Sequence, residues 1–331
     1  MKRSKLSSAL RDFGRLKDVR QLSKDDEHRI EEQPRLVSRF YDVVTRFYEF
    51  GWGTTFHFSP RQPGQSLRKS QQRHDEAIGE LLQLKPGMHV ADIGCGVGGP
   101  LVNIARATGA SITGINFNSH QIRRGEDRVR REGLSDSCSF LYANYMDVPL
   151  ENGTFDAAYS FEAVCHSPNK PLAFHELFRL LKPNGKAAIV DWCLTSTFDS
   201  AIDQHVDVRD RIERTNATPE LLTTDQYVDA ILSAGFEVIE AVDQQATNCH
   251  PSTPWYMALQ GRDASMSSFA RVPAGRALTE GVTRVLEWMR LAPAGTYEAA
   301  RILNVAADAL VEAGELGIFT PSFLVHVRKP T

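Results

Sequence analysis

The sequence predicts an α/β protein in which helices cover both faces of a mostly parallel sheet. Apolar runs alternate with helical patterns from residue 88 to residue 242, and this alternation is typical of parallel strands joined by crossover helices. Gly94, Gly96, Gly98 and Gly99 directly follow the first apolar run. Such glycines permit a tight turn and a close approach of the backbone to a ligand, so a binding site is expected at the end of the first strand.

The composition is that of an ordinary globular protein and disfavours several functional classes. The 331 residues suffice for one large domain with an insertion or for two smaller ones. A net charge of -3 provides no basic surface for nucleic acid. No signal peptide and no membrane span are evident, so we expect a cytoplasmic protein in which any membrane contact is peripheral. The five cysteines form no CxxC pair, which predicts free thiols and no metal site.

The segment 35–58 is the first with a distinct character, after a charged amino-terminal arm expected over residues 1–34. Eight aromatic residues fall between residues 40 and 58, the first of them at helical spacing, and Gly51 offers a stop signal. A helix that closes over the core explains these aromatics, and so does one wall of a hydrophobic pocket. The two interpretations are compatible, because one helix has two edges.

The remaining elements follow from periodicity and turn residues. Strands are predicted near residues 88–93, 111–116, 138–142, 155–160, 185–192 and 236–242, and helices near residues 70–84, 99–108, 118–132, 170–181 and 224–234. Residues 35–242 thus form a predicted ligand-binding domain. A helical, substrate-binding insertion is predicted over residues 243–318, with patterns at 276–291 and 297–313, followed by a final strand within residues 319–331.

The ligand at the glycine turn is predicted to be S-adenosylmethionine. The spacing Gly94-x-Gly96-x-x-Gly99 fits the dinucleotide fingerprint, but Asp92 lies two residues before it. A carboxylate there repels a pyrophosphate, whereas S-adenosylmethionine carries an ammonium and a sulfonium. Asn116 ends the second strand, where a nicotinamide-binding protein relies on an acidic residue. A nicotinamide-dependent reductase and a turn without a ligand are therefore the weaker alternatives.

The loops after the third and fourth strands carry further candidate residues. Asn144 and Tyr145 follow the third strand, in the loop that borders the adenine in this fold, although a surface loop without function is an alternative for each. Glu162 and His166 follow the fourth strand and lie four residues apart, so a helical turn places them on one face. A lone histidine is more often structural, but this pair favours a site role.

Several motifs resemble those of known methyltransferases. Residues 90–100 resemble the first motif of class I methyltransferases, and the aromatic segment 48–58 resembles the signature of sterol 24-C-methyltransferases. Segments 94–100, 162–168, 254–256 and 319–330 are similar to further motifs of that family. The resemblance runs in order from about residue 38 to the end. Two positions depart from it, since Asn144 and Phe117 stand where the family usually has Asp and Asn.

The resemblance implies a class I methyltransferase fold, with a last strand antiparallel to the others, and methyl transfer from S-adenosylmethionine to the side-chain alkene of a sterol through a carbocation. It implies catalytic roles for Tyr48, Glu49, Glu162 and His166, in which Tyr48 lines the cation, the two carboxylates stabilise it and His166 is the base or positions it. The substrate-binding residues it implies are Trp52, Phe56, His57, Phe58, Trp255 and Tyr256. The cofactor-binding residues it implies are Asp92, Gly94, Cys95, Gly96, Gly98, Asn116, Gln121, Asn144, Tyr145 and Glu162.

Three alternatives to this function are left open. A C-methyltransferase for another lipid or isoprenoid, of the cyclopropane-forming or tocopherol type, shares the fold and the cofactor. A nicotinamide-dependent reductase is favoured only by the glycine spacing. A binder of sterol or S-adenosylmethionine without activity shares the residues but not the turnover. The sterol is the expected partner in the main interpretation, and association of the chain with itself is left open.

Overall fold

The computed structural model describes most of the chain. The described residues are Val37, Tyr41, Thr45 and the ranges 53–250, 252–261, 272–292 and 296–331. The predicted arm over residues 1–34 lies outside them, as do Tyr48, Glu49 and Trp52. The predictions made for these residues stay predictions.

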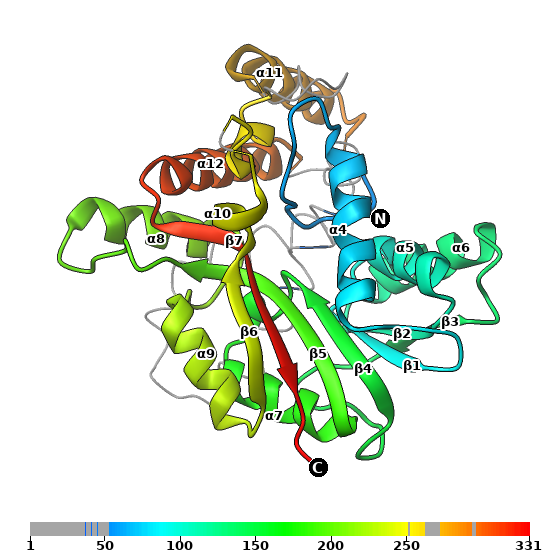
Figure 1. The fold of residues 1–331 in the computed structure, drawn as a ribbon. Coiled ribbons are helices and arrows are strands. Elements are labelled where there is room, and N and C mark those ends of the chain that lie inside the picture. The colour runs from blue at the N-terminus through cyan, green and yellow to red at the C-terminus, as the bar shows by residue number, and fades with distance from the viewer. Residues whose placement is uncertain are drawn as a thin grey trace.

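Within the described residues, seven strands form one sheet in the order β3-β2-β1-β4-β5-β7-β6 (Figure 1). The strands are β1 (His89–Ile93), β2 (Ser111–Asn116), β3 (Cys138–Tyr142), β4 (Phe155–Phe161), β5 (Leu181–Leu194), β6 (Glu237–Asp243) and β7 (Phe319–Arg328). Neighbouring strands from β3 to β5 are parallel, whereas β7 is antiparallel to both β5 and β6. The predicted fold class is confirmed, including the antiparallel last strand.

Helices cover both faces of the sheet, because successive side chains of a strand point to opposite faces. Ala187 and Ile189 of β5 lie in one hydrophobic core, while Ala188 and Val190 lie in the other. The first core is closed by α7 (Lys170–Leu180) and α9 (Thr224–Ser233), and the second by α4 (Leu67–Leu81) and α5 (Gly99–Thr108). Helix α6 (Ser119–Arg131) packs beside β3 and β2.

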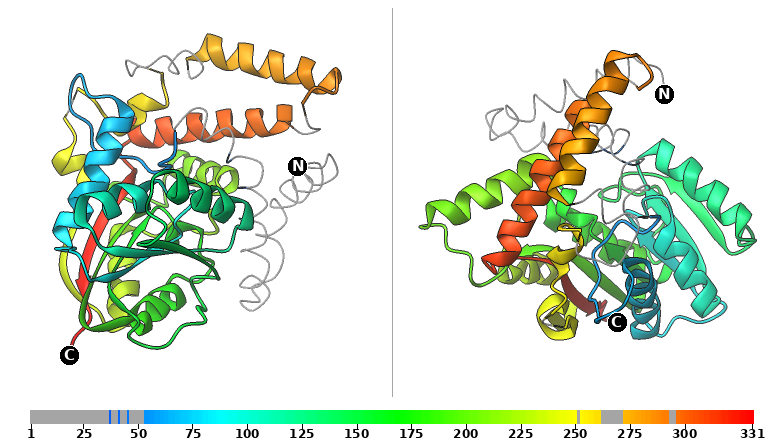
Figure 2. Two further views of the ribbon diagram at one scale, coloured as in Figure 1. Left: turned by 90° about the vertical axis from the view of Figure 1, so that its right-hand side faces the viewer. Right: turned by 90° about the horizontal axis from the view of Figure 1, so that it is seen from above.

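A third core lies beyond the carboxyl ends of the parallel strands. It joins the end of β5 to α8 (Asp203–Thr215), to the short helix η2 (Trp255–Ala258) and to α12 (Thr296–Glu315). Helix α11 (Pro273–Trp288) lies over α12, on the side away from the sheet (Figure 2). The segment between β6 and β7 therefore contains the two predicted helices, together with η2 and the short α10 (Gln244–Asn248). Its predicted role as a substrate-binding unit stays a prediction.

Helix α8 is the main element absent from the predicted set. Its segment is strongly charged, and only Val208 and Ile212 are buried among its apolar residues. Only three of its thirteen residues are apolar, so the segment offers little hydrophobic signal, and tertiary packing against α12 stabilises this helix. None of the described helices is both long enough and apolar enough to cross a membrane.

Candidate active site

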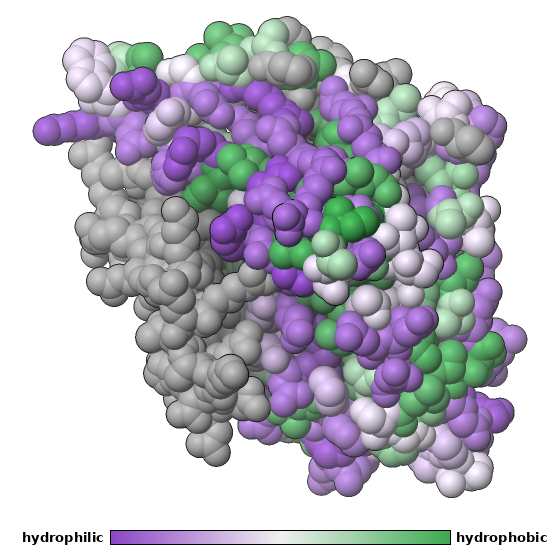
Figure 3. All heavy atoms as spheres, turned by 90° about the vertical axis from the view of Figure 1, so that its left-hand side faces the viewer, coloured by the Kyte–Doolittle hydropathy of each residue, from purple (hydrophilic) through white to green (hydrophobic). Residues whose placement is uncertain are grey.

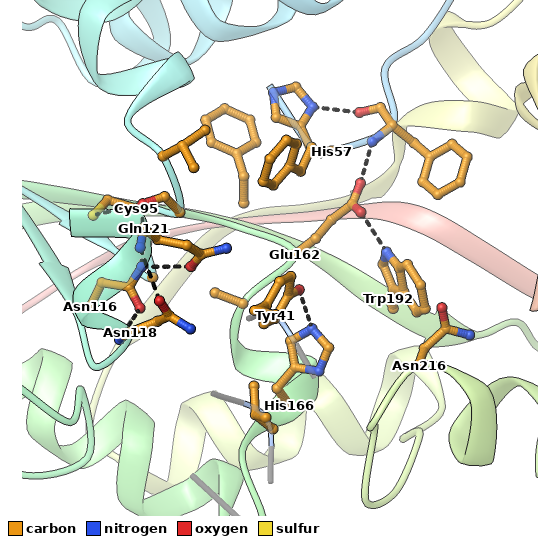
Figure 4. Close-up of a pocket in the computed structure, with 18 of the residues that line it drawn as sticks. Tyr41, His57, Cys95, Asn116, Asn118, Gln121, Glu162, His166, Trp192 and Asn216 are labelled. Carbon is orange, nitrogen blue, oxygen red and sulfur yellow. Dashed lines mark hydrogen bonds between the residues drawn. The ribbon is translucent and has the colours of Figure 1, made fainter. Parts of the chain in front are cut away.

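A cavity of about 270 Å³ lies at the carboxyl ends of β1, β2 and β4. Four parts of the chain form its wall: the glycine loop (residues 94–100), the segment 54–58, the loop after β4 and one face of α12. Figure 4 shows Cys95, His57 and Glu162, one from each of the first three parts, around the cavity. Tyr41, Phe117, Trp192 and Asn216 complete much of the wall between them. The aromatic segment and the Glu162 loop, which are far apart in sequence, therefore meet across one hollow.

The glycine loop presents bare backbone to this cavity. Gly94 has a φ of 73°, and a Cβ there would stand 2.3 Å from the Cβ of Ala163. A Cβ on Gly96 would meet only the Phe56 ring at 3.9 Å, so the backbone at this position faces open space. Gly98 is different: it is absent from the cavity wall, and a Cβ there would stand 3.0 Å from the Phe140 ring. Gly98 thus packs closely against Phe140, and its predicted ligand contact stays a prediction.

Asp92 places a buried carboxyl at the bottom of the cavity. Its side chain is 2% exposed, and burial raises its pKa to about 8, against a smaller opposing effect of the neighbouring Tyr159 hydroxyl. Among the described residues, none provides a hydrogen-bond partner for its Oδ2 atom. A buried oxygen without a donor is costly, so a ligand that brings a positively charged N–H group fits this position.

Polar side chains at the end of β2 form the neighbouring wall. The Nδ2 group of Asn116 donates to Gln121 Oε1 at 2.9 Å and to the Gly96 carbonyl at 3.3 Å. Asn118 caps α6 by accepting from the backbone N–H groups of His120 and Gln121. These bonds fix the amides of Asn116 and Gln121 beside the glycine loop, where both line the cavity.

The loop after β3 contributes one of its two predicted residues to the wall. Tyr145 lines the cavity, and its hydroxyl donates to the Ala163 carbonyl at 3.1 Å. Asn144 does not line it. Its Oδ1 atom instead accepts from the backbone N–H of Met146 at 3.1 Å, within a tight turn closed by Asp147. Asn144 therefore forms a turn beside the cavity, and its predicted adenine contact stays a prediction.

Glu162 is the most constrained side chain of the site. Its Oε1 atom accepts from the backbone N–H of Phe58 at 2.5 Å, and its Oε2 atom accepts from the indole N–H of Trp192 at 2.7 Å (Figure 4). Its φ of 49° is unfavourable for a residue with a Cβ. Burial raises its pKa to about 8, and His57 opposes the rise. Two donors and a strained backbone thus hold one carboxylate at the cavity wall.

His57 lines the cavity, but both of its ring nitrogens are already engaged. Nε2 lies 2.6 Å from Asp75 Oδ1, and Nδ1 lies 2.7 Å from the Phe58 carbonyl oxygen. Both neighbours are acceptors, so both nitrogens carry hydrogen and the ring is an imidazolium. Burial alone would lower the pKa of His57, but the charge and hydrogen bond of Asp75 raise it, with help from Glu162. A polar contact with substrate is thereby excluded for the nitrogens of His57.

His166 lies across the cavity from the glycine loop. Its Nδ1 atom lies 3.3 Å from the Ala217 carbonyl oxygen, which accepts only, so the hydrogen is on Nδ1. Its Nε2 atom then accepts from the Tyr41 hydroxyl at 2.9 Å. Burial lowers the pKa of His166 to about 4, so the ring is neutral at physiological pH.

Trp255 and Tyr256 are not on the cavity wall. Trp255 packs edge-on against Phe58 with ring centroids 5.2 Å apart, and it also contacts Phe319 and Tyr256. Both residues belong to the third hydrophobic core or pack against it. Trp255 thus supports the cavity residue Phe58 from behind, and the predicted substrate contacts of Trp255 and Tyr256 stay predictions.

Sequence reasoning missed four contributors to the site. Trp192 lies near the carboxyl end of the buried strand β5, and this strand-end position is a signal that could have found it. Tyr41 is one of the eight aromatic residues between residues 40 and 58, and its spacing alone does not predict a role in the site. Asp75 lies in the interior of α4. The apolar residues of α12 that line the cavity belong to a segment for which the sequence predicts only a helix. Nothing local distinguishes these last two, because tertiary structure alone brings them to the cavity.

Comparisons with known proteins identify the families and relatives that this chain resembles. A sterol methyltransferase C-terminal model matches residues 266–331, and a methyltransferase domain model matches residues 91–189. Cycloartenol-C-24-methyltransferase 1 of Oryza sativa subsp. japonica is 42% identical over 295 residues, which cover 89% of this chain and 85% of that protein. The sterol 24-C-methyltransferase of Saccharomyces cerevisiae is 35% identical over 312 residues, covering 92% and 81%.

Solved structures share the fold at lower identity. The cyclopropane synthase MmaA2 from Mycobacterium tuberculosis superposes with a TM-score of 0.65 at 16% identity, over 87% of this chain and 95% of that one. The geranyl diphosphate C-methyltransferase from Streptomyces coelicolor, solved with S-adenosyl-L-homocysteine, gives 0.59 at 16% identity, over 88% and 98%. At these identities the likeness concerns the fold alone.

The sheet order, the glycine loop at the end of β1 and the cavity beside it define a class I methyltransferase dependent on S-adenosylmethionine. The orphaned Asp92 oxygen and the open backbone at Gly96 fit the ammonium and the close approach of that cofactor. Within this class, the identity over most of both chains shows that the protein belongs to the sterol C-24-methyltransferase family. The reductase interpretation is therefore wrong.

Proposed function

We propose that this enzyme methylates carbon 24 of a sterol that carries a double bond in its side chain. One observation carries the proposal: the Glu162 carboxylate lies in the wall of a cavity that is continuous from the glycine loop to the apolar face of α12. That face presents Leu303, Ala306, Ala307 and Leu310, which suit the hydrocarbon of a sterol. The glycine loop, the Glu162 carboxylate and the apolar face of α12 thus follow one another along a single cavity.

The bound S-adenosylmethionine supplies an electrophilic methyl group. We assign its ammonium to Asp92, its backbone contacts to Gly94, Cys95 and Gly96, and its ribose to the amide of Asn116. Gln121 fixes that amide through the hydrogen bond to its Oε1 atom. Tyr145 closes the wall beside Phe117, with ring centroids 6.1 Å apart. Each assignment rests on the position of the side chain at the cavity wall.

The substrate alkene would contribute the electron pair of the new carbon–carbon bond. The bond from the methyl group to sulfur would break with its electron pair left on sulfur, so S-adenosylhomocysteine would leave and a tertiary carbocation would remain in the sterol side chain. Glu162 offers this cation an opposite charge in a site with little water, where Coulomb attraction is stronger than in bulk solvent. The Phe56 ring also lines the cavity and can face a cation. A hydride shift and the loss of one proton then yield a neutral alkene. Tyr48, Glu49 and Trp52 stay predicted contributors.

His166 is assigned as the base that takes this proton. A carbocation is so strong an acid that a neutral imidazole with a low pKa still accepts its proton readily. The Nε2 atom carries the lone pair, because Nδ1 donates to the Ala217 carbonyl. The Tyr41 hydroxyl occupies that lone pair in the structure, so it must yield or relay the proton. Glu162 already accepts two hydrogen bonds, which makes it the less suitable base.

His57 is a positioning residue in this scheme and has no polar role toward substrate. Its imidazolium donates to the Phe58 carbonyl, and the Phe58 backbone N–H donates to Glu162. Asp75 balances its charge, and Asn103 Nδ2 holds the other Asp75 oxygen at 2.7 Å. The buried positive ring keeps a larger fraction of Glu162 ionised than burial alone would allow. Trp255 packs edge-on against Phe58, and Tyr256 packs edge-on against Trp255.

The deciding experiment is incubation with methyl-labelled S-adenosylmethionine and a panel of sterols, with products identified by mass spectrometry. Label is expected only in sterols with a side-chain double bond at carbon 24, and a sterol with a saturated side chain is the matched control. Label in unsaturated phospholipid acyl chains, with none in sterols, would establish the alternative lipid methyltransferase instead. Cofactor binding without any labelled product would indicate a binder without activity.

A further inference from the structure

Helix α11 has its polar side chains facing the protein. Arg276 pairs with Asp308 of α12, and Glu280 accepts from Asn304 Nδ2 at 2.6 Å. Glu287 accepts from the backbone N–H of Tyr297 at 3.0 Å. These three residues of α11, spaced by four and seven positions, form one stripe along a helix. Three polar contacts therefore join α11 to α12, where an amphipathic surface helix usually presents apolar side chains.

The opposite face of α11 and the turn after it are apolar and exposed. The exposed fractions of its large hydrophobic side chains are 56% for Leu278, 46% for Val282, 52% for Val285, 83% for Trp288, 52% for Met289 and 70% for Leu291. Figure 3 shows hydrophobic side chains along the upper edge of the molecule, where α11 lies in Figure 1. We call these six residues the outer face of α11. Exposed apolar area of this kind marks an interaction surface.

The outer face belongs to the same helix pair that borders the cavity. Arg276, near the start of α11, lines the cavity, and its guanidinium donates to the Leu259 carbonyl at 2.7 Å. Helix α12, directly below, supplies the apolar cavity wall. A partner on the outer face therefore sits one helix away from the proposed sterol site, at the end of the molecule opposite the carboxyl terminus (Figure 1).

We propose that the outer face of α11 docks on a phospholipid bilayer, from which the enzyme takes its sterol. The inference rests on the proposed function, because a water-insoluble sterol reaches the cavity from a membrane. An apolar stripe that ends in an exposed tryptophan has the character of an interfacial helix. The Arg284 guanidinium beside the stripe lies 5.9 Å from the centre of the Tyr297 ring of α12. A second copy of the chain, the competing occupant, explains the apolar stripe but not its place beside the cavity.

The test is co-sedimentation of the full chain with phosphatidylcholine vesicles, comparing the wild type with Val282→Glu/Val285→Glu. Both positions are solvent-exposed and outside the cavity, so folding should be retained. The matched control is Leu232→Glu/Ile239→Glu, which places two charges on exposed apolar positions of α9 and β6. The vesicle-bound fraction is expected to fall about tenfold or more in the α11 variant and to stay unchanged in the control.

Activity measured with two sterol sources separates this inference from the proposed function. With sterol in vesicles, the α11 variant should lose turnover in parallel with binding. With sterol delivered from cyclodextrin, it should match the wild type. Equal vesicle binding by both proteins would overturn the docking inference, and so would a wild-type dimer that the α11 variant converts to a monomer in light scattering. If the wild type methylates sterol from neither source, the proposed function is refuted instead.

Discussion

At the scale of single residues, the protonation states of His57, His166 and Glu162 determine the charge in the cavity. The neutral ring of His166 and the imidazolium of His57 differ because of their neighbours and not because of their burial, since both are buried. His57 faces two acceptors, whereas His166 faces one acceptor and one hydroxyl. Burial favours the neutral form of Glu162, whereas its hydrogen-bond donors favour the charged form. A small change in these neighbours therefore alters the charge present in the cavity.

Replacement of Glu162 with Gln should lower kcat by about a hundredfold to a thousandfold, because a fixed opposite charge at a developing cation is lost. The Gln side chain retains one oxygen acceptor, so the hydrogen bond from Trp192 or Phe58 survives in part. Turnover with labelled cofactor measures the effect, and the KM for S-adenosylmethionine should change little. Turnover near the wild-type rate would remove Glu162 from the mechanism.

The pH dependence of the same reaction follows from the raised pKa of Glu162. Since the carboxylate is the active form, kcat/KM should rise with pH up to about pH 8 in the free enzyme. Asp75→Asn removes the charge that keeps His57 protonated, so the pKa of Glu162 should increase and the rise should move to higher pH. Asn103→Ala, which removes one hydrogen bond to Asp75 but no charge, is the matched control. Identical profiles for all three proteins would refute the positioning role of His57.

At the scale of elements, the segment 54–58 is fixed to the cofactor loop by close packing. A Cβ on Gly99 would stand 2.2 Å from the Thr54 carbonyl oxygen, which is backbone and cannot rotate away. Gly99→Ala should therefore push this segment outward, raise the KM for S-adenosylmethionine about tenfold and destabilise the fold by about 1–3 kcal/mol. Gly281→Ala, in α11 with nothing within 4 Å, should leave both KM and folding intact. Kinetics and thermal unfolding measure both variants.

The sequence predicted elements well where the signal is local. The strands 111–116 and 138–142 and the helix 99–108 have the predicted bounds, because each lies between clear turn residues. Helix α8 was missed because only packing defines it. In the site, strand-end positions such as Asp92, Asn116 and Glu162 could be named in advance and do line the cavity. The engagement of His57 by Asp75 could not, because it joins a loop to a helix interior through tertiary structure alone.

At the scale of the whole molecule, the unliganded protein holds two strongly perturbed carboxyl groups in one cavity. Burial raises the pKa of Asp92 from 3.8 to about 8, and that of Glu162 from 4.5 to about 8. A pKa raised in the folded state means that the folded protein binds more protons than the unfolded chain between these two values. The stability that these groups contribute is therefore fully present below about pH 4 and is lost as the pH rises toward about pH 8.

Asp92→Asn removes one of these groups. The unfolding temperature of this variant should therefore rise relative to that of the wild type as the pH increases from about 5 to about 8. The difference should reach a few degrees, because one pKa unit corresponds to about 1.4 kcal/mol. S-adenosylmethionine should raise the unfolding temperature of the wild type most at the high end of this range, where its ammonium meets an ionised Asp92. In the variant that gain should largely disappear. Parallel unfolding curves for the two proteins, with equal gains from the cofactor, would show that Asp92 does not bind the ammonium.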